Sequence, residues 1–321
     1  MPVSQAHKAD LLLLVVTLLA AISWMFSREA VLAMPPLLFM SLRFLLAAAV
    51  LACVAWRQLG RLSLQQLIRC LRVGLVFGTA MSCWIMGLAF ADHVGEGAFL
   101  TSLGVVLVPV IARLVFGEAV PGSTWLALPI ATGGLALLSL DRGLHLEAGQ
   151  LFFVAAATIF ALYFNLNTRA ANTITTISAS GERIEHPRVP ALALTTVVLT
   201  TVGLVTGTLS AFLEPWQTTW QQATPILAMW VILSATVGTA LRFLVQTYAQ
   251  SLSLHSHGVV IMVLEPMWTA LIAAAWFGET MTLIQLAGCA LIFVSLLVNR
   301  WRALRTLLKQ ALGPRSKPDH P

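Results

Sequence analysis

Charged side chains are scarce in this sequence. Lysine, arginine, aspartate and glutamate make up 10% of its 321 residues, whereas hydrophobic residues make up 58%. Soluble proteins usually carry about 25% charged residues. With 19 basic and 13 acidic side chains, the chain cannot cover the surface of a soluble globule of this size. The deficit excludes an ordinary soluble enzyme, a disordered chain and a nucleic-acid binder, and it indicates an integral membrane protein.

Patterned cysteine and histidine clusters and catalytic motifs are also missing. The sequence has no CxxC, no Walker sequence, no GxSxG and no HExxH. It therefore predicts no metal site, no cofactor, no direct ATP coupling and no hydrolytic machinery. His255 and His257 share one turn, but two histidines cannot complete a zinc site alone. The four cysteines fit small buried hydrophobic residues: Cys53, Cys70, Cys83 and Cys289.

Long apolar runs dominate what is present. A transmembrane helix needs about 20 mostly apolar residues, and no strand-like alternation appears. The sequence therefore predicts an all-α integral membrane protein with ten transmembrane helices. The first run is too long for a signal peptide and is expected to stay as a helix. The predicted spans are 11–31, 35–55, 71–91, 96–116, 122–140, 149–170, 191–212, 226–249, 258–277 and 282–299.

The cations predict the orientation. Ten spans put both termini on one side, and a cytoplasmic placement leaves only Arg28 and Arg142 outside. This is a strong positive-inside bias, and it favours an even number of spans. The net charge of +6 is then a marker of topology. The fourteen inner cations are Lys8, Arg57, Arg61, Arg69, Arg72, Arg169, Arg183, Arg188, Arg300, Arg302, Arg305, Lys309, Arg315 and Lys317.

An internal repeat divides the chain. The fourth predicted span ends in Phe116-Gly117-Glu118 and the ninth in Phe277-Gly278-Glu279, with Pro109 and Pro266 upstream. The two glutamates are 161 residues apart, which is half the chain. Five spans per half force the second half to insert upside down, as in many secondary transporters. The predicted divisions are a first repeat over 1–140, a second over 141–300 and a basic cytoplasmic tail over 301–321.

The sequence resembles the EamA-type ten-helix proteins of the drug/metabolite transporter superfamily over residues 11 to 299. Two departures are Met25, where relatives often have glycine, and the unequal spacing of Pro109 and Pro266 from their glutamates. The matching residues are Trp24, Pro35-Pro36, Leu42-Arg43-Phe44, Ala98-Phe99-Leu100-Thr101-Ser102-Leu103, Val106-Leu107-Val108-Pro109, Gly117-Glu118, Gly238-Thr239-Ala240, Gln246-Thr247-Tyr248-Ala249-Gln250, Leu264-Glu265-Pro266 and Gly278-Glu279.

The resemblance implies a secondary transporter of the cytoplasmic (inner) membrane. It implies export of a small metabolite, amino acid or amphipathic drug, although the sequence does not fix the direction. The partners expected are membrane lipid and a small-molecule substrate, and a homodimer stays open. Two alternatives also stay open. One is a membrane enzyme built on Asp92, His93 and Glu96, and the other is a sensor that transports nothing.

Three charged residues inside predicted spans are the main candidates for function. Such charges are costly in lipid and need internal partners or a water-filled cavity. Arg43 could attract an anionic or zwitterionic solute, or it could lock helix packing. Arg242 and Glu265 lie at similar depths in the eighth and ninth spans, so they are expected to form a buried ion pair. Glu265 could instead carry a proton.

Polar and aromatic residues on apolar spans predict a solute cavity. Gln246 and Gln250 are four residues apart and share a helix face. Glu118 and Glu279 are expected at helix ends as interfacial groups, with a gating role as the alternative. No catalytic or metal-binding residue is predicted. The candidates for the cavity are Trp24, Arg43, Trp84, Ser102, Tyr163, Asn165, Gln246, Gln250 and Trp268.

Overall fold

The structure is a computed structural model of the chain. It describes residues 3–119, 122–140, 147–177, 183–216, 224–246 and 264–299, together with Trp301 and Arg305. The predicted cavity residue Gln250, the two histidines of the predicted cytoplasmic turn and most of the predicted tail over 301–321 lie outside these residues.

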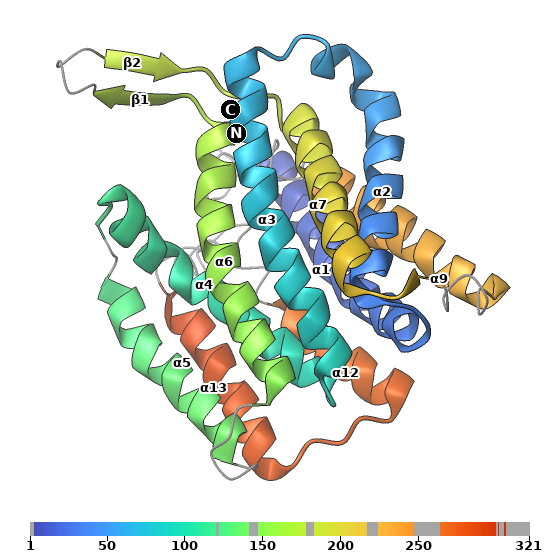
Figure 1. The fold of residues 1–321 in the computed structure, drawn as a ribbon. Coiled ribbons are helices and arrows are strands. Elements are labelled where there is room, and N and C mark those ends of the chain that lie inside the picture. Colours follow the sequence, from blue (N-terminus) through green and yellow to red (C-terminus); the bar gives the residue numbers. More distant parts are fainter. Residues whose placement is uncertain are drawn as a thin grey trace, which may run out of the picture.

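Helices form nearly all of the described structure (Figure 1). The first half contains α1 (Val3–Ala33), α2 (Pro36–Leu59), α3 (Leu64–Phe90), α4 (Val94–Phe116) and α5 (Gly122–Leu140). The second half contains α6 (Ala148–Ala171), β1 (Ile174–Ile177), β2 (Arg183–His186), α7 (Ala191–Leu213), α9 (Pro225–Ala235), the π-helix η1 (Thr236–Leu241), α12 (Glu265–Phe277) and α13 (Leu283–Asn299).

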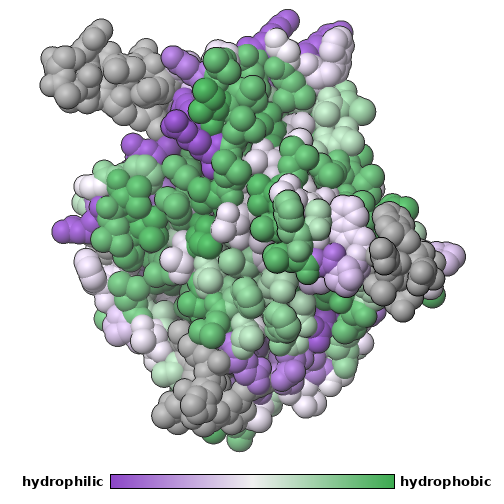
Figure 2. All heavy atoms as spheres, viewed as in Figure 1, coloured by the Kyte–Doolittle hydropathy of each residue, from purple (hydrophilic) through white to green (hydrophobic). Residues whose placement is uncertain are grey.

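Seven of the described helical segments are long and apolar enough to cross a membrane. They correspond to α1, α2, α3, α4, α6 and α7, and to the continuous segment Pro225–Gln246. Figure 2 shows hydrophobic side chains over much of the visible face, with hydrophilic residues gathered toward its upper and lower ends. The chain is therefore a helical, multi-pass membrane protein.

Local sequence signals explain several helix ends. Pro36 begins α2, where a missing N–H costs nothing. The Ser63 side chain and Gln66 form a capping box at the start of α3. Gly117 and Gly278 end α4 and α12 in the left-handed conformation, with φ of 71° and 66°. The repeated Phe-Gly-Glu sequence thus has one physical basis, because glycine adopts this conformation without a Cβ penalty.

A short hairpin joins α6 to α7. β1 and β2 pair antiparallel, with Ile174 opposite His186 and Ile177 opposite Arg183. These strands lie between the predicted spans 149–170 and 191–212, where the sequence predicts no strand. The hairpin extends from one end of the helical body (Figure 1). The all-helical prediction therefore holds for the apolar body, to which the hairpin is an addition.

Most contacts between helices of the two halves follow one pattern. α2 packs against α7, α4 against α12, and α5 against α13. α3 packs against α6 and α7, while α9 packs against α1 and α2. Likewise, α4 packs against α6, and α12 packs against α1. The helices α1, α2, α3, α4 and α5 correspond in order to α6, α7, α9, α12 and α13. When each helix is replaced by its counterpart, every pair named above becomes another pair named above or stays the same.

Different hydrogen bonds join the helices at the two ends of the helical body. At the hairpin end, Arg69 donates to Pro187 O at 2.9 Å and to Arg169 O at 2.7 Å. At the opposite end, the Glu279 carboxylate accepts from the Val94 and Gly95 N–H groups at 2.8 and 3.3 Å. We call these the hairpin end and the opposite end.

The carbonyl that the proline inside α4 leaves without a partner accepts a hydrogen bond from another helix. Pro109 has no N–H, so it cannot donate to the carbonyl of Val105 four residues earlier. Asn299 Nδ2 donates to that carbonyl at 3.2 Å, and Asn299 Oδ1 accepts from Thr124 Oγ1 at 2.8 Å. The last residue of α13 thus joins α4 to α5.

Neighbouring glycines in α5 give a test of the α5–α13 contact. A Cβ on Gly134 would lie 2.8 Å from Gly288 O and 2.7 Å from an Ile292 side-chain carbon, whereas a Cβ on Gly133 would meet only Leu291 at 4.0 Å. Gly134→Leu is therefore expected to abolish recovery of folded protein, because backbone must move to admit the side chain. Gly133→Leu is the control and should give a normal monodisperse peak in size-exclusion chromatography. Equal yields of the two variants would contradict this packing.

Candidate functional site

Arg43 lies deep in α2 and is 3% exposed. Its Nε donates to Thr239 Oγ1 at 2.6 Å, its Nη1 to Ser27 Oγ at 2.7 Å, and its Nη2 to Ser23 Oγ at 2.6 Å. All three guanidinium nitrogens thus have partners from α1 and η1. This arrangement matches the packing alternative for Arg43 more closely than direct solute binding.

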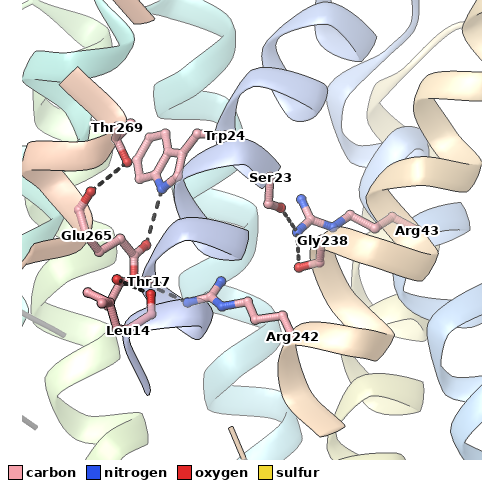
Figure 3. A network of polar contacts seen from close by, with 9 residues as sticks. All are labelled: Leu14, Thr17, Ser23, Trp24, Arg43, Gly238, Arg242, Glu265 and Thr269. Carbon is pink, nitrogen blue, oxygen red and sulfur yellow. Dashed lines mark hydrogen bonds and ion pairs between the residues drawn. The ribbon is translucent and has the colours of Figure 1, made fainter. Parts of the chain in front are cut away.

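The π-helix η1 explains how this arrangement forms. Thr239 Oγ1 donates to Ser234 O, five residues earlier, at 2.9 Å. The widened turn presents Gly238 O to Arg43 Nη2 at 3.4 Å (Figure 3). A Cβ on Gly238 would lie 2.5 Å from Ser23 Oγ, so only glycine permits this close approach of η1 to α1. Such π-turns are frequent at functional sites.

Arg242 and Glu265 form a half-buried ion pair beside this arrangement (Figure 3). Arg242 Nη2 lies 3.4 Å from Glu265 Oε2, and the side chains are 21% and 20% exposed. Trp24 Nε1 donates to Glu265 Oε1 at 3.3 Å. The structure therefore brings together three predicted site residues, from α1, from the helical residues that follow η1 and from α12.

Aromatic side chains lie around the ion pair. Trp24 contacts Trp84 with a centroid distance of 4.7 Å and Phe153 with one of 5.8 Å. Tyr163 stacks on Phe77 at 4.0 Å and lies within electrostatic range of Arg242. Trp24 and Trp84 thus belong to one aromatic cluster with Phe153, and Tyr163 belongs to a second cluster with Phe77.

Sequence reasoning missed three aromatic members of these two clusters: Phe77, Phe153 and Phe243. The Arg242 guanidinium lies 5.6 Å from the Phe243 ring centroid, and Phe243 lies 6.5 Å from Phe77. Adjacency to Arg242 could have identified Phe243, because arginine often lies over aromatic rings. Nothing in the sequence distinguishes Phe77 or Phe153 from other core phenylalanines.

Several polar atoms near the pair are buried and have no hydrogen-bond partner in the part of the chain that the structure describes. They include Arg242 Nε, Gln246 Oε1 and Trp268 Nε1. Gln246 follows Arg242 by four residues, and Trp268 follows Glu265 by three, which is about one helical turn in each case. Buried polar groups normally find partners, so these atoms mark a place where a ligand could bind.

Ser102 and Asn165 have other roles in the structure. Ser102 Oγ donates to Phe99 O of its own helix at 2.6 Å. Asn165 Nδ2 donates to Ala161 O at 2.8 Å and to Val108 O at 2.9 Å, which links α6 to α4. These contacts use one donor group of each side chain, and the prediction that Ser102 and Asn165 line the cavity stays a prediction.

The two glutamates of the repeat have different partners. Glu118 pairs with Arg169 at 2.6 Å, where the side chains are 52% and 32% exposed. Glu279 instead accepts two N–H groups at the start of α4. Glu214, which sequence reasoning missed, accepts from Leu37 N at 2.8 Å and Leu38 N at 2.9 Å in the same way.

Asp92, His93 and Glu96 line a small pocket at the opposite end together with Glu147 and Gln150. The buried Glu96 carboxylate accepts from Gln150 Nε2. Among the described residues, no three His, Cys, Asp or Glu side chains form a group that could hold a metal ion.

Comparison with known proteins identifies the family. The profile of the EamA-like transporter family matches twice along the chain, over residues 7–140 and 147–301. The chain belongs to the EamA-like transporter family. This membership confirms the resemblance found in the sequence, including its two repeats, and identifies the protein as a membrane transporter. An uncharacterized transporter of Archaeoglobus fulgidus is 27% identical over 212 residues, which cover 66% of this chain and 68% of the relative.

A solved structure supports the fold of this EamA-like protein. It is described only as the crystal structure of a protein, and it matches with a TM-score of 0.62. The match covers 93% of this chain and 99% of the other chain at 17% sequence identity. At this identity the likeness concerns the fold alone.

Proposed function

We propose that the protein is a secondary transporter that moves a small organic solute by alternating access. In this proposal, ten transmembrane helices form two inverted five-helix repeats over 1–140 and 141–300. The protein lies in the cytoplasmic membrane with both termini and the basic tail over 301–321 in the cytoplasm. Membrane lipid and the solute are its partners, and a homodimer is compatible with this arrangement.

One observation carries the proposal. The polar and aromatic site is built from both repeats, since Trp24 and Trp84 come from the first and Arg242 and Glu265 come from the second. Transporters with inverted repeats bind their solutes between the repeats near the membrane midplane. Most helix pairs between the two halves have a counterpart when the halves are exchanged. This correspondence supports two alternative arrangements of the same helices around the site.

The solute is a metabolite, amino acid or amphipathic drug, and the protein exports it. Gln246 and Trp268 supply further hydrogen-bonding groups, and the two aromatic clusters suit an apolar part of the solute. Two other functions compete, namely a membrane enzyme based on the pocket at Asp92, His93 and Glu96, and a sensor.

Solute counterflow in proteoliposomes tests the proposal. Vesicles holding purified protein are preloaded with an unlabelled candidate, and entry of the labelled form is followed while mass spectrometry checks its structure. We expect labelled solute to accumulate transiently and chemically unchanged, and protein-free vesicles to show no accumulation. Chemical conversion would favour the enzyme. Binding without movement across the panel of metabolites, amino acids and dyes would favour the sensor.

The opposite end gives a test of alternating access. Glu214 and Glu279 each join the second repeat to a helix start in the first, where a carboxylate also stabilises the helix dipole. Hydrogen bonds to charged groups contribute about 1.5–3 kcal/mol. The double variant Glu214→Gln with Glu279→Gln is therefore expected to raise the population open at that end by about tenfold or more.

The readout is labelling of a cysteine at the site by a membrane-impermeant maleimide, with Trp84→Cys in a background without the four native cysteines. Labelling from the opposite end should become faster in the double variant. Glu118→Gln is the control, because Glu118 pairs with Arg169 at the other end of α4. Unchanged labelling in the double variant would contradict the closing role of these glutamates.

A further inference from the structure

The interior of the helical body holds more positive than negative charge around the site. Arg43 and Arg242 lie within electrostatic range of each other. Arg242 has one carboxylate partner, Glu265. Within the described residues Arg43 has no carboxylate partner: hydroxyl and carbonyl oxygens accept its hydrogen bonds, and the ring centroids of Phe39 and Phe44 lie 6.0 and 5.7 Å from its guanidinium. One cationic charge is thus left uncompensated at membrane depth, where charges are costly unless paired.

The contact between Arg242 and Glu265 leaves one nitrogen of the guanidinium edge without a partner. Its 3.4 Å distance is longer than the 2.7–2.9 Å typical of hydrogen bonds between charged groups. Nη2 and Nε form one edge of the guanidinium, and on this edge Nε is buried without a partner. A carboxylate can bind such an edge through two parallel hydrogen bonds. The edge is therefore only half used by Glu265.

The surroundings suit a solute with an acceptor group and an apolar body. Arg242 Nε and Trp268 Nε1 are both donors, and both are buried without partners in the described part of the chain. Phe243 lies against the guanidinium, and the stack of Phe77 on Tyr163 lies nearby. An aromatic surface next to a cation accommodates an apolar group attached to an anion.

We propose that the transported solute carries a net negative charge, as a single carboxylate on an apolar body. The carboxylate binds the Nε–Nη2 edge of Arg242 and competes there with Glu265, which occupies part of the edge when no solute is bound. A monoanion neutralises the excess cationic charge, whereas a zwitterion leaves it and a cation increases it. This inference rests on the proposed transport function and specifies its solute.

Four probes of nearly equal shape test the charge class. They are 3-phenylpropionate, its amide 3-phenylpropionamide, the cation 3-phenylpropylamine and the zwitterion phenylalanine. Binding to the purified full chain in lipid nanodiscs is measured by isothermal titration calorimetry. We expect the carboxylate to bind about tenfold or more tightly than the other three, because it accepts two charge-assisted hydrogen bonds and neutralises the excess cationic charge. The amide brings no charge, and the amine and phenylalanine bring an ammonium group that the two arginines repel.

Substitutions at the site test which residues cause the preference for the carboxylate. Arg242→Gln should remove the preference for the carboxylate over the amide, measured on the monodisperse protein because the variant also breaks the pair with Glu265. Arg242→Lys keeps the charge but not the planar edge, so it should bind the carboxylate with intermediate affinity. Glu265→Gln should tighten carboxylate binding because it removes the competing group. Arg113→Gln is the matched control, since Arg113 is an exposed cation of α4 away from the site.

Three results would overturn the inference. The first is binding of the amine or the zwitterion that is tighter than binding of the carboxylate. The second is a carboxylate that binds no better than its amide, and the third is weaker carboxylate binding in Glu265→Gln. Counterflow of the same probes separates the two proposals. Movement of the amide or amine without the carboxylate would refute the charge class and leave transport standing. Carboxylate binding without movement of any probe would refute transport alone.

Discussion

Arg242→Glu alone is expected to destabilise the protein by about 3 kcal/mol and to abolish solute exchange in proteoliposomes. The substitution places two carboxylates where the structure has an ion pair of 3.4 Å. Breaking a buried pair costs about 3–5 kcal/mol. The side chains are 21% and 20% exposed, so the lower value applies. Glu265→Arg alone should have a similar effect, because it adds a third cation next to Arg43 and Arg242.

Combining the two substitutions tests the pairing directly. Arg242→Glu with Glu265→Arg restores opposite charges at the same two positions, so the double variant should melt at a higher temperature than either single variant. The measurement is the thermal midpoint in detergent, together with the monodisperse yield. If the double variant folds no better than the worse single variant, the two side chains do not stabilise each other. Solute exchange should recover less than folding does, since the guanidinium edge then projects from a different helix.

Much of the helical framework follows from the sequence because it depends on local composition. The predicted run 122–140 has the same bounds as α5, and the run 35–55 differs from α2 by a few residues. The glycines of the two Phe-Gly-Glu sequences mark helix ends through their own backbone preference. The hairpin escaped prediction because eight strand residues in a polar connection give no long periodic pattern.

The site is only partly encoded in local patterns. Ser23 and Ser27 are four residues apart on α1 and share a face, which is a signal that could have identified hydroxyl partners for Arg43. The depth of Arg242 and Glu265 in neighbouring spans could also be estimated from the sequence. The partners of Glu214 could not, because they lie 176 and 177 residues away and are reached only through tertiary packing.

Thr239→Val is expected to lower stability by about 2–3 kcal/mol, the upper part of the range of about 1.5–3 kcal/mol for a lost hydrogen bond to a charged group. Valine has nearly the shape of threonine but cannot accept the hydrogen bond that Arg43 Nε makes at 2.6 Å. Arg43 is 3% exposed, so water does not replace the lost oxygen. The measurement is the thermal midpoint in detergent, converted to free energy with the enthalpy of the wild-type transition.

The variant Arg43→Met, alone and combined with Thr239→Val, completes a double-mutant cycle. Without the guanidinium, Thr239→Val removes only the hydroxyl contact to Ser234 O and should cost about 1 kcal/mol. Thr236→Val is the matched control, since Thr236 donates to Ile232 O within the same helix and does not contact Arg43. A coupling free energy of about 1–2 kcal/mol between Arg43 and Thr239 would show that Arg43 stabilises the packing of the helices. Equal costs in both backgrounds would contradict that assignment. A packed Arg43 keeps its hydroxyl partners throughout transport, which leaves Arg242 as the arginine available to a solute.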